Sequence, residues 1–196
     1  MSPLRASLRT KGAMLAGLAL LGCAGVRRDT SSALPPPTVP PPYAAVATIQ
    51  ELMLTQVDPS ADFLWAAVAS TSTAAGFEEK QPRTDDEWSA VRANALTLIE
   101  ATNLLMVPGR RVASPGALTA DADLPGIEPP ERIQKAIDGD RAAFVRLADN
   151  LRATGLKALA AADRRDATAL FDIGGEIDKA CEQCHQKYWY PEPGAR

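Results

Sequence analysis

The sequence predicts an all-α protein organised as an antiparallel four-helix bundle. In four separate segments, apolar residues recur at three- and four-residue steps, the spacing of one buried helix face. Aromatic residues make up only 5% of the 196 residues, whereas Ala and Leu, which favour helices over sheets, are abundant. Helix-start and helix-stop signals separate the segments, and no strand signal or internal repeat competes with them.

The first helix is expected from about Ala44 to Ser70. Asp58-Pro59 should break or kink it, because Asp before Pro is a signal for the start of a new helical segment. The expected inward face comprises Val46, Ile49, Met53 and Val57 before this point, and Phe63, Leu64, Ala67 and Val68 after it.

The second helix is expected to follow a connector at residues 74–82. Thr84 and Glu87 have the spacing of a capping box, which places the helix start at Thr84. The helix should end near Val107-Pro108-Gly109. Its expected inward face is Trp88, Val91, Ala95, Leu98, Thr102 and Leu105.

A long loop over residues 110–130 and a short helix ending at Gly139 should lead to the last two helices. The third should span about Asp140–Ala161, with Phe144, Leu147, Leu151, Ala158 and Leu159 facing inward. The fourth should span about Arg164–Tyr190, with Ala167, Leu170, Gly174, Ile177, Cys181, Cys184 and Tyr188 on one face. Gly174 and Gly175 either permit a close approach or are a tolerated weakness.

The residues before 44 are expected to lie outside the bundle. A basic start and a short apolar run, Ala13–Leu21, are typical of a secretory signal and too short for a membrane span. The run ends in Leu20-Leu21-Gly22-Cys23, which resembles a bacterial lipobox. Residues 1–22 are therefore interpreted as a lipoprotein signal peptide and Cys23 as the lipidated first residue of the mature chain. The alternative is an ordinary cleavage site that happens to contain a cysteine.

Residues 23–43 are interpreted as a Pro-rich tether. Eight residues from Pro35 to Pro42 include six prolines, and such runs favour an extended, semi-rigid polyproline II conformation. The tether would hold the bundle, residues 44–191, away from a membrane. A binding motif for a proline-recognising partner is the alternative.

Near the C-terminus, Cys181-Glu182-Gln183-Cys184-His185 has the form of a c-type haem attachment site. Cys181 and Cys184 lie three apart on one helix face, so each can form a thioether with a haem vinyl group, and His185 can bind the iron. A thioredoxin-like pair would need a βαβ setting. A structural zinc site would need four ligands, and the chain has three Cys and one His.

The second axial ligand is constrained by counting. His185 is the single histidine, and Met1 and Met14 would leave with the signal peptide. The candidates are Met53, Met106, a lysine, an exogenous molecule or none. Met53 lies on the apolar face of the first helix and is the favoured distal ligand, with core packing as the plain alternative.

Two functions remain. With Met53 bound, the saturated iron would serve a single-electron carrier; without it, an open position would bind NO or CO in a gas-binding or sensing protein. The 21 basic and 24 acidic residues give no basic stripe for nucleic acid. No second histidine is available for a hydrolytic or peroxidase site, so the protein is not expected to be an enzyme.

A four-helix bundle with Cys-x-x-Cys-His on its last helix resembles the cytochrome c-prime superfamily, including its cytochrome c-556 type. The resemblance covers about residues 44–190. Gln50–Met53, Asn103–Arg110 and Cys181–Pro191 look like segments of a lipoprotein-like branch. The resemblance implies one covalent haem, a distal residue from the first helix at Met53, a periplasmic location and redox partner proteins. It extends to a homodimer through the first helix, and Ala24 resembles a signal for outer-membrane sorting.

Overall fold

The computed structural model describes residues 43–74 and 76–191, a mostly helical domain. The predicted signal peptide, Cys23 and all of the tether except residue 43 lie outside the described residues. The first helical stretch comprises α1 (Ile49–Leu52), η1 (Met53–Val57) and α2 (Asp58–Ala67). It is followed by β1 (Ala69–Thr73), β2 (Gly76–Lys80), α3 (Asp85–Leu105), α4 (Pro130–Gly139), α5 (Arg141–Arg164) and α6 (Ala167–Tyr188).

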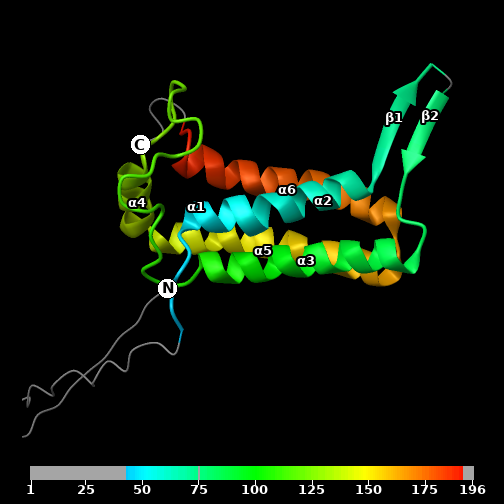
Figure 1. The fold of residues 1–196 in the computed structure, drawn as a ribbon, viewed down its shortest axis with the longest axis horizontal. Coiled ribbons are helices and arrows are strands. Elements are labelled where there is room, and N and C mark those ends of the chain that lie inside the picture. Colours follow the sequence, from blue (N-terminus) through cyan, green and yellow to red (C-terminus); the bar gives the residue numbers. More distant parts are fainter. Residues whose placement is uncertain (1–42, 75, 192–196) are drawn as a thin grey trace, which may run out of the picture. The chain divides into compact units, whose positions relative to one another are not determined.

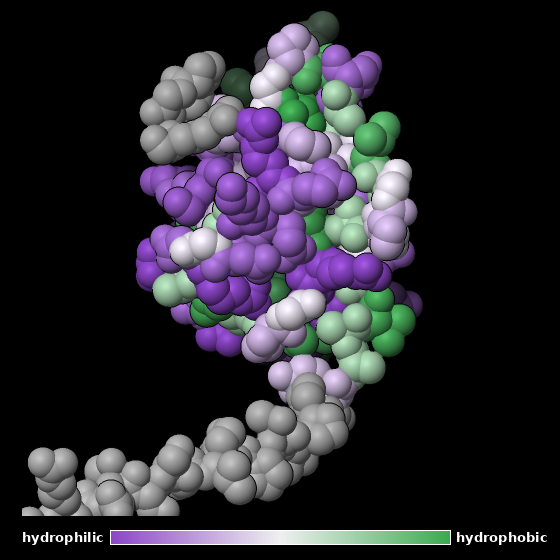
Figure 2. Space-filling model, turned by 90° about the vertical axis from the view of Figure 1, so that its left-hand side faces the viewer, coloured by the Kyte–Doolittle hydropathy of each residue, from purple (hydrophilic) through white to green (hydrophobic). Residues whose placement is uncertain are grey.

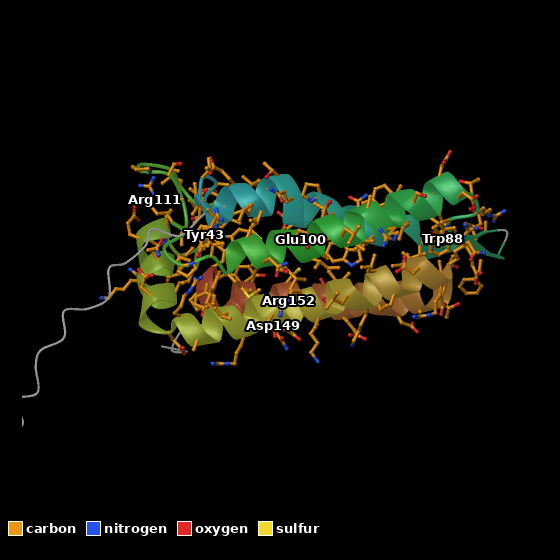
Figure 3. All side chains as sticks on the ribbon, turned by 90° about the horizontal axis from the view of Figure 1, so that it is seen from below. Tyr43, Trp88, Glu100, Arg111, Asp149 and Arg152 are labelled. Atoms are coloured by element: carbon orange, nitrogen blue, oxygen red, sulfur yellow. The ribbon has the colours of Figure 1, made fainter. Side chains whose placement is uncertain are left out.

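The long helices α3, α5 and α6 and the shorter α2 lie side by side (Figure 1). Helix α3 packs on α5, α5 on α6, and α2 on both α3 and α6. The buried core draws on all four, with Leu64, Leu98, Leu151 and Ile177 as examples. On the outside, Arg152 of α5 donates to Asn103 of α3 at 3.2 Å and pairs with Asp149 (Figure 3). Asn103 in turn donates to Glu100 at 3.3 Å.

The first helix begins later than predicted. Thr48 accepts a hydrogen bond from the Glu51 amide and the Glu51 carboxylate accepts one from the Thr48 amide, so these residues form a capping box that starts α1 at Ile49. Val46 precedes the cap and is 89% exposed, so its assignment to the inward face was wrong. Ile49 and Val57 are buried as predicted.

The predicted break at Asp58-Pro59 is a change of helix type. The chain stays helical, but Met53–Val57 forms a π-helical turn in which the Asp58 amide donates to the Met53 carbonyl. Pro59 has no amide hydrogen and its ring crowds the carbonyl four residues earlier, so the ordinary α-helical pattern cannot continue through it. After the turn, Leu64 and Val68 are buried and Ala67 is half-buried, as predicted. Phe63, also predicted inward, is 38% exposed, and Ala61 is buried in addition.

The connector expected at residues 74–82 is instead part of an antiparallel hairpin, in which Ala69 pairs with Lys80 and Thr73 with Gly76. The absence of strands was therefore a wrong prediction. The Ser and Thr residues of β1 suit an extended chain, and Gly76 adopts a φ of 126° that only glycine readily tolerates. The hairpin projects from the end of the helices opposite α4 (Figure 1).

The other helices follow the prediction closely. The Thr84–Glu87 capping box is present, and every predicted inward residue of α3 is buried. Asp140 and Asp166 cap the starts of α5 and α6 by accepting from backbone amides. On α5, Phe144, Leu151 and Ala158 are buried, while Leu147 and Leu159 are half-buried against the core.

Gly174 permits a close helix approach, the first of its two predicted roles. The Trp65 indole N–H of α2 donates to the Gly174 carbonyl at 2.9 Å. A Cβ atom at Gly174 would lie 3.1 Å from Trp65 Cδ1. Gly155 plays the same part between α5 and α3, because a Cβ there would lie 2.9 Å from Ile99 Cγ1.

We predict that Gly155→Ala destabilises the domain although alanine favours helices. Overpacking of this kind costs about 1–3 kcal/mol, more than the gain of about 1 kcal/mol from replacing glycine in a helix. Gly175→Ala is the matched control, since no atom lies within 4 Å of its added Cβ, and it should be neutral or stabilising. Urea unfolding followed by circular dichroism measures both, and equal stabilisation by the two changes would contradict the α3–α5 contact.

Candidate haem site

The last two turns of α6 present the Cys-x-x-Cys-His motif to the interior. The helix continues unbroken from Ala167 to Tyr188, so Cys181 and Cys184 lie on one face with the buried Ile177 and Ala180. Both thiols are free and half-buried against the core. The sequence-predicted stripe is therefore continuous from the helix start to the motif.

An apolar pocket, here called the outer chamber, lies beside the motif. It encloses about 130 Å³, less than the roughly 300–1,000 Å³ of most small-molecule and cofactor sites. Its lining residues are Ile49, Gln50, Met53, Leu54, Asp58, Val112, Thr119, Ala120, Ile133, Ile137, Phe144, Cys184, His185, Tyr188 and Trp189. Figure 2 views the end of the domain that carries α4, where hydrophilic side chains cover the middle of the outer face.

A smaller inner chamber lies deeper between the helices. It is lined by Met53, Val57, Asp58, Leu105, Phe144, Leu147, Ala148, Leu151, Ala180, Cys181, Cys184 and His185. The two chambers share Met53, Asp58, Phe144, Cys184 and His185. The fold thus gathers all three motif residues and Met53 around neighbouring apolar spaces.

Met53 is the first residue of the π-helical turn. Such turns are rare and often lie at functional sites, because the extra residue re-aims the side chains around it. Leu52, one residue earlier, is 1% exposed in the core, whereas Met53 is half-buried and lines both chambers. Met106, the other candidate ligand, caps the end of α3 and lines neither chamber.

Burial makes the two thiols poor nucleophiles. It raises the pKa of Cys181 to about 12, with the Asp58 charge adding to the effect, and that of Cys184 to about 11. A reactive redox pair needs the opposite, a lowered pKa at a helix N-terminus or beside cations. Here the pair lies near the C-terminal end of α6, so a thioredoxin-like use is not supported.

Asp58 is a site residue that the sequence analysis treated only as a helix signal. Asp58 lines both chambers together with His185. Partial burial raises the pKa of Asp58, and the His185 charge partly offsets this. Burial in turn lowers the pKa of His185, with Asp58 and Glu182 acting in the opposite direction. A neutral imidazole is the form that binds a metal.

Aromatic rings and the long loop close the site at the end of α6. The His185 ring meets Trp189 edge-on, with centroids 5.1 Å apart, and Tyr190 at 6.0 Å. The Trp189 indole donates to the Ala120 carbonyl at 3.2 Å, and the Trp189 carbonyl accepts from the Glu128 amide at 2.8 Å. The expectation that residues 110–130 form a loop wrapping the helices is confirmed here.

Two arginines fix the start of this loop. Arg110 is 4% exposed and donates to the Leu104 and Ala47 carbonyls. Arg141 donates to the Met106 and Val107 carbonyls at 2.8 and 3.2 Å and lies over the Phe144 ring. The Arg141 contacts satisfy two carbonyls just beyond the end of α3, and they join that end to Phe144 in the wall of the chambers.

Tyr188 carries a buried polar atom without a hydrogen-bond partner in the described part of the chain. Its ring packs edge-on against Phe144 at 5.8 Å, and its hydroxyl is buried. Burial raises the pKa of Tyr188 to about 12, so the hydroxyl stays protonated and can donate. A buried donor at a pocket wall calls for an acceptor, which an ordered water or a bound ligand can supply.

Comparisons of the chain with protein-family models, with curated proteins and with solved structures found no match. Within residues 43–74 and 76–191, no group of three or more His, Cys, Asp or Glu side chains is placed to hold a metal ion. In the same residues, no helix has the length and apolar character needed to cross a membrane.

The motif predicts that Cys181 and Cys184 together carry the haem covalently. The chain should retain haem stain on a denaturing gel, and the Cys181→Ala, Cys184→Ala double variant should lose it, because no thioether remains. The single variants Cys181→Ser and Cys184→Ser change the packing little. Each should keep one thioether and therefore part of the covalent haem stain. Full covalent stain in the double variant would contradict the assignment of the motif.

Proposed function

We propose that the protein is a c-type cytochrome that carries single electrons through one covalently attached haem. The observation that carries this proposal is the meeting of Met53 with Cys181, Cys184 and His185 around the two apolar chambers. The motif alone predicts covalent attachment of the haem and one iron ligand, His185. The Met53 side chain on the opposite side supplies a second iron ligand.

The residues present fit a haem. Two half-buried, protonated thiols three residues apart match thioether attachment, and a half-buried imidazole follows them. The chamber lining is predominantly apolar, as a porphyrin face requires, and the Tyr188 hydroxyl offers one unpaired donor. The haem would supply a one-electron ferrous–ferric couple.

Met53 and His185 would hold the iron from opposite sides and leave no open position. A thioether is a soft ligand that favours ferrous iron and raises the reduction potential. The loop and the aromatic rings would keep water from the iron, which limits reorganisation around the changing charge. The protein would then transfer electrons without acting as an enzyme.

The proposal includes the architecture and the family. We assign the packing of α2, α3, α5 and α6 to an antiparallel four-helix bundle, with α1 and η1 extending its first helix and α4 in the long crossover. A haem held between the facing helices of such a bundle would agree with the proposed membership of the cytochrome c-prime superfamily. The hairpin is an addition at the opposite end.

The location is proposed from the sequence. Export through residues 1–22 would deliver the chain to the periplasm, where covalent haem attachment takes place, and a lipid on Cys23 would anchor it to the outer membrane. With Cys23 lipidated and two cysteines bound to haem, no thiol is left over. A mass spectrum showing an unmodified N-terminus at another residue would reject the anchor.

Replacing Met53 distinguishes electron transfer from gas binding. Met53→Ala should open the sixth position, convert the ferric haem from low to high spin, lower the potential and admit CO. Met106→Ala is the matched control and should keep the low-spin spectrum, because Met106 lines neither chamber. Optical spectra with and without CO measure both. If Met53→Ala left the spectrum and CO uptake unchanged, Met53 would not be a ligand.

A further inference from the structure

A second, polar groove runs between α5 and α6 on the outside of the domain. Its floor consists of the buried Ala143 and Thr154 and the half-buried Leu147. Because Ala143 and Thr154 have small side chains, a hollow remains between α5 and α6. The Asn150 amide of α5 donates to the Gln183 side chain of α6 at 3.2 Å and bridges it.

Positive charge is concentrated along this groove. Arg146 on α5 and Lys179 and Lys187 on α6 line it, and all three are exposed. None of the three forms an ion pair with a carboxylate of the described residues. Glu176 is the acidic residue in the lining, and it is paired with Lys157. The whole chain carries a formal charge of −3, so this cluster is a local reversal of sign.

The groove and the inner chamber share a wall. Leu147 lines both spaces, with the three cations on its outer side and Cys181 and Cys184 on its inner side. Gln183, which lies between the two cysteines in the motif, lines the groove from α6. The positive surface is therefore the outer face of the same helical turns that carry the attachment motif.

We propose that the α5–α6 groove docks the acidic surface of a redox partner protein, so that electrons pass through the Leu147 wall. This rests on the proposed electron-transfer function. Lys187 also lies over the Tyr188 ring, with its Nζ 5.6 Å from the ring centroid. Exposed cations that lack a carboxylate partner steer a negatively charged partner protein and set its orientation, and they act chiefly on the rate of association. The polar lining suits a transient complex, because such interfaces are polar and wet.

Charged small oxidants and reductants test the surface before a partner is known. Electron transfer between the intact cytochrome and ferricyanide, an anion, should be accelerated by the groove, whereas transfer with hexaammineruthenium, a cation, should be slowed. Lys179→Glu should reduce the ferricyanide rate at low salt by about threefold or more and raise the ruthenium rate. Adding Arg146→Glu should increase both effects, and salt should remove them.

Lys80→Glu is the matched control, because it makes the same charge change at the hairpin on the far end of the helices. Its rates should stay close to those of the unchanged protein. Equal rate changes in Lys80→Glu and Lys179→Glu, or no change in Lys179→Glu, would overturn the docking surface. The haem spectrum is recorded in the same samples. A chain without haem would refute the proposed function. A low-spin haem with unchanged rates in Lys179→Glu would refute only the docking surface.

Discussion

Pro59 imposes the constraint on which the site depends. Because it cannot donate a backbone hydrogen bond and crowds the preceding turn, the helix adopts a π-helical turn at Met53–Val57. That turn separates the phase of α1 from that of α2. Before the turn, the buried residues are Ile49 and Leu52. After the turn, they are Ala61 and Leu64. Met53 and Asp58, at the two ends of the turn, both line the chambers that face α6.

The chemistry of the site follows from burial. An apolar setting keeps both thiols protonated and His185 inclined to be neutral, which disfavours nucleophilic redox chemistry and suits attachment and ligation of a haem. The same helices that provide this apolar interior carry Arg146, Lys179 and Lys187 on their outer faces. Interior and exterior are separated by single side chains such as Leu147, so a cofactor held inside would be within reach of a partner outside.

Sequence reasoning recovered the helices that have clear caps and a regular apolar period. The Thr84–Glu87 cap and the inward face of α3 are confirmed, and the α6 stripe leads into the motif as expected. The Thr48–Glu51 cap had the same readable signal and was missed, which misplaced Val46. Phe63 was misassigned because a π turn shifts the helix phase, and no fixed period anticipates that shift. The hairpin was missed because short Ser/Thr strands carry no apolar alternation. The meeting of Asp58, Phe144 and Trp189 at the site could not be predicted, because only tertiary packing brings them together.

In the proposed cytochrome, His185 and Met53 together saturate a covalently held haem iron. The most direct test is the optical spectrum of the unchanged protein, ferric and ferrous, recorded with and without CO. We expect a low-spin spectrum in both oxidation states and no response to CO, because no coordination position is open. A high-spin ferric spectrum with rapid CO uptake would contradict ligation of the iron by Met53. It would indicate a five-coordinate, gas-binding haem with Met53 as a wall of the pocket.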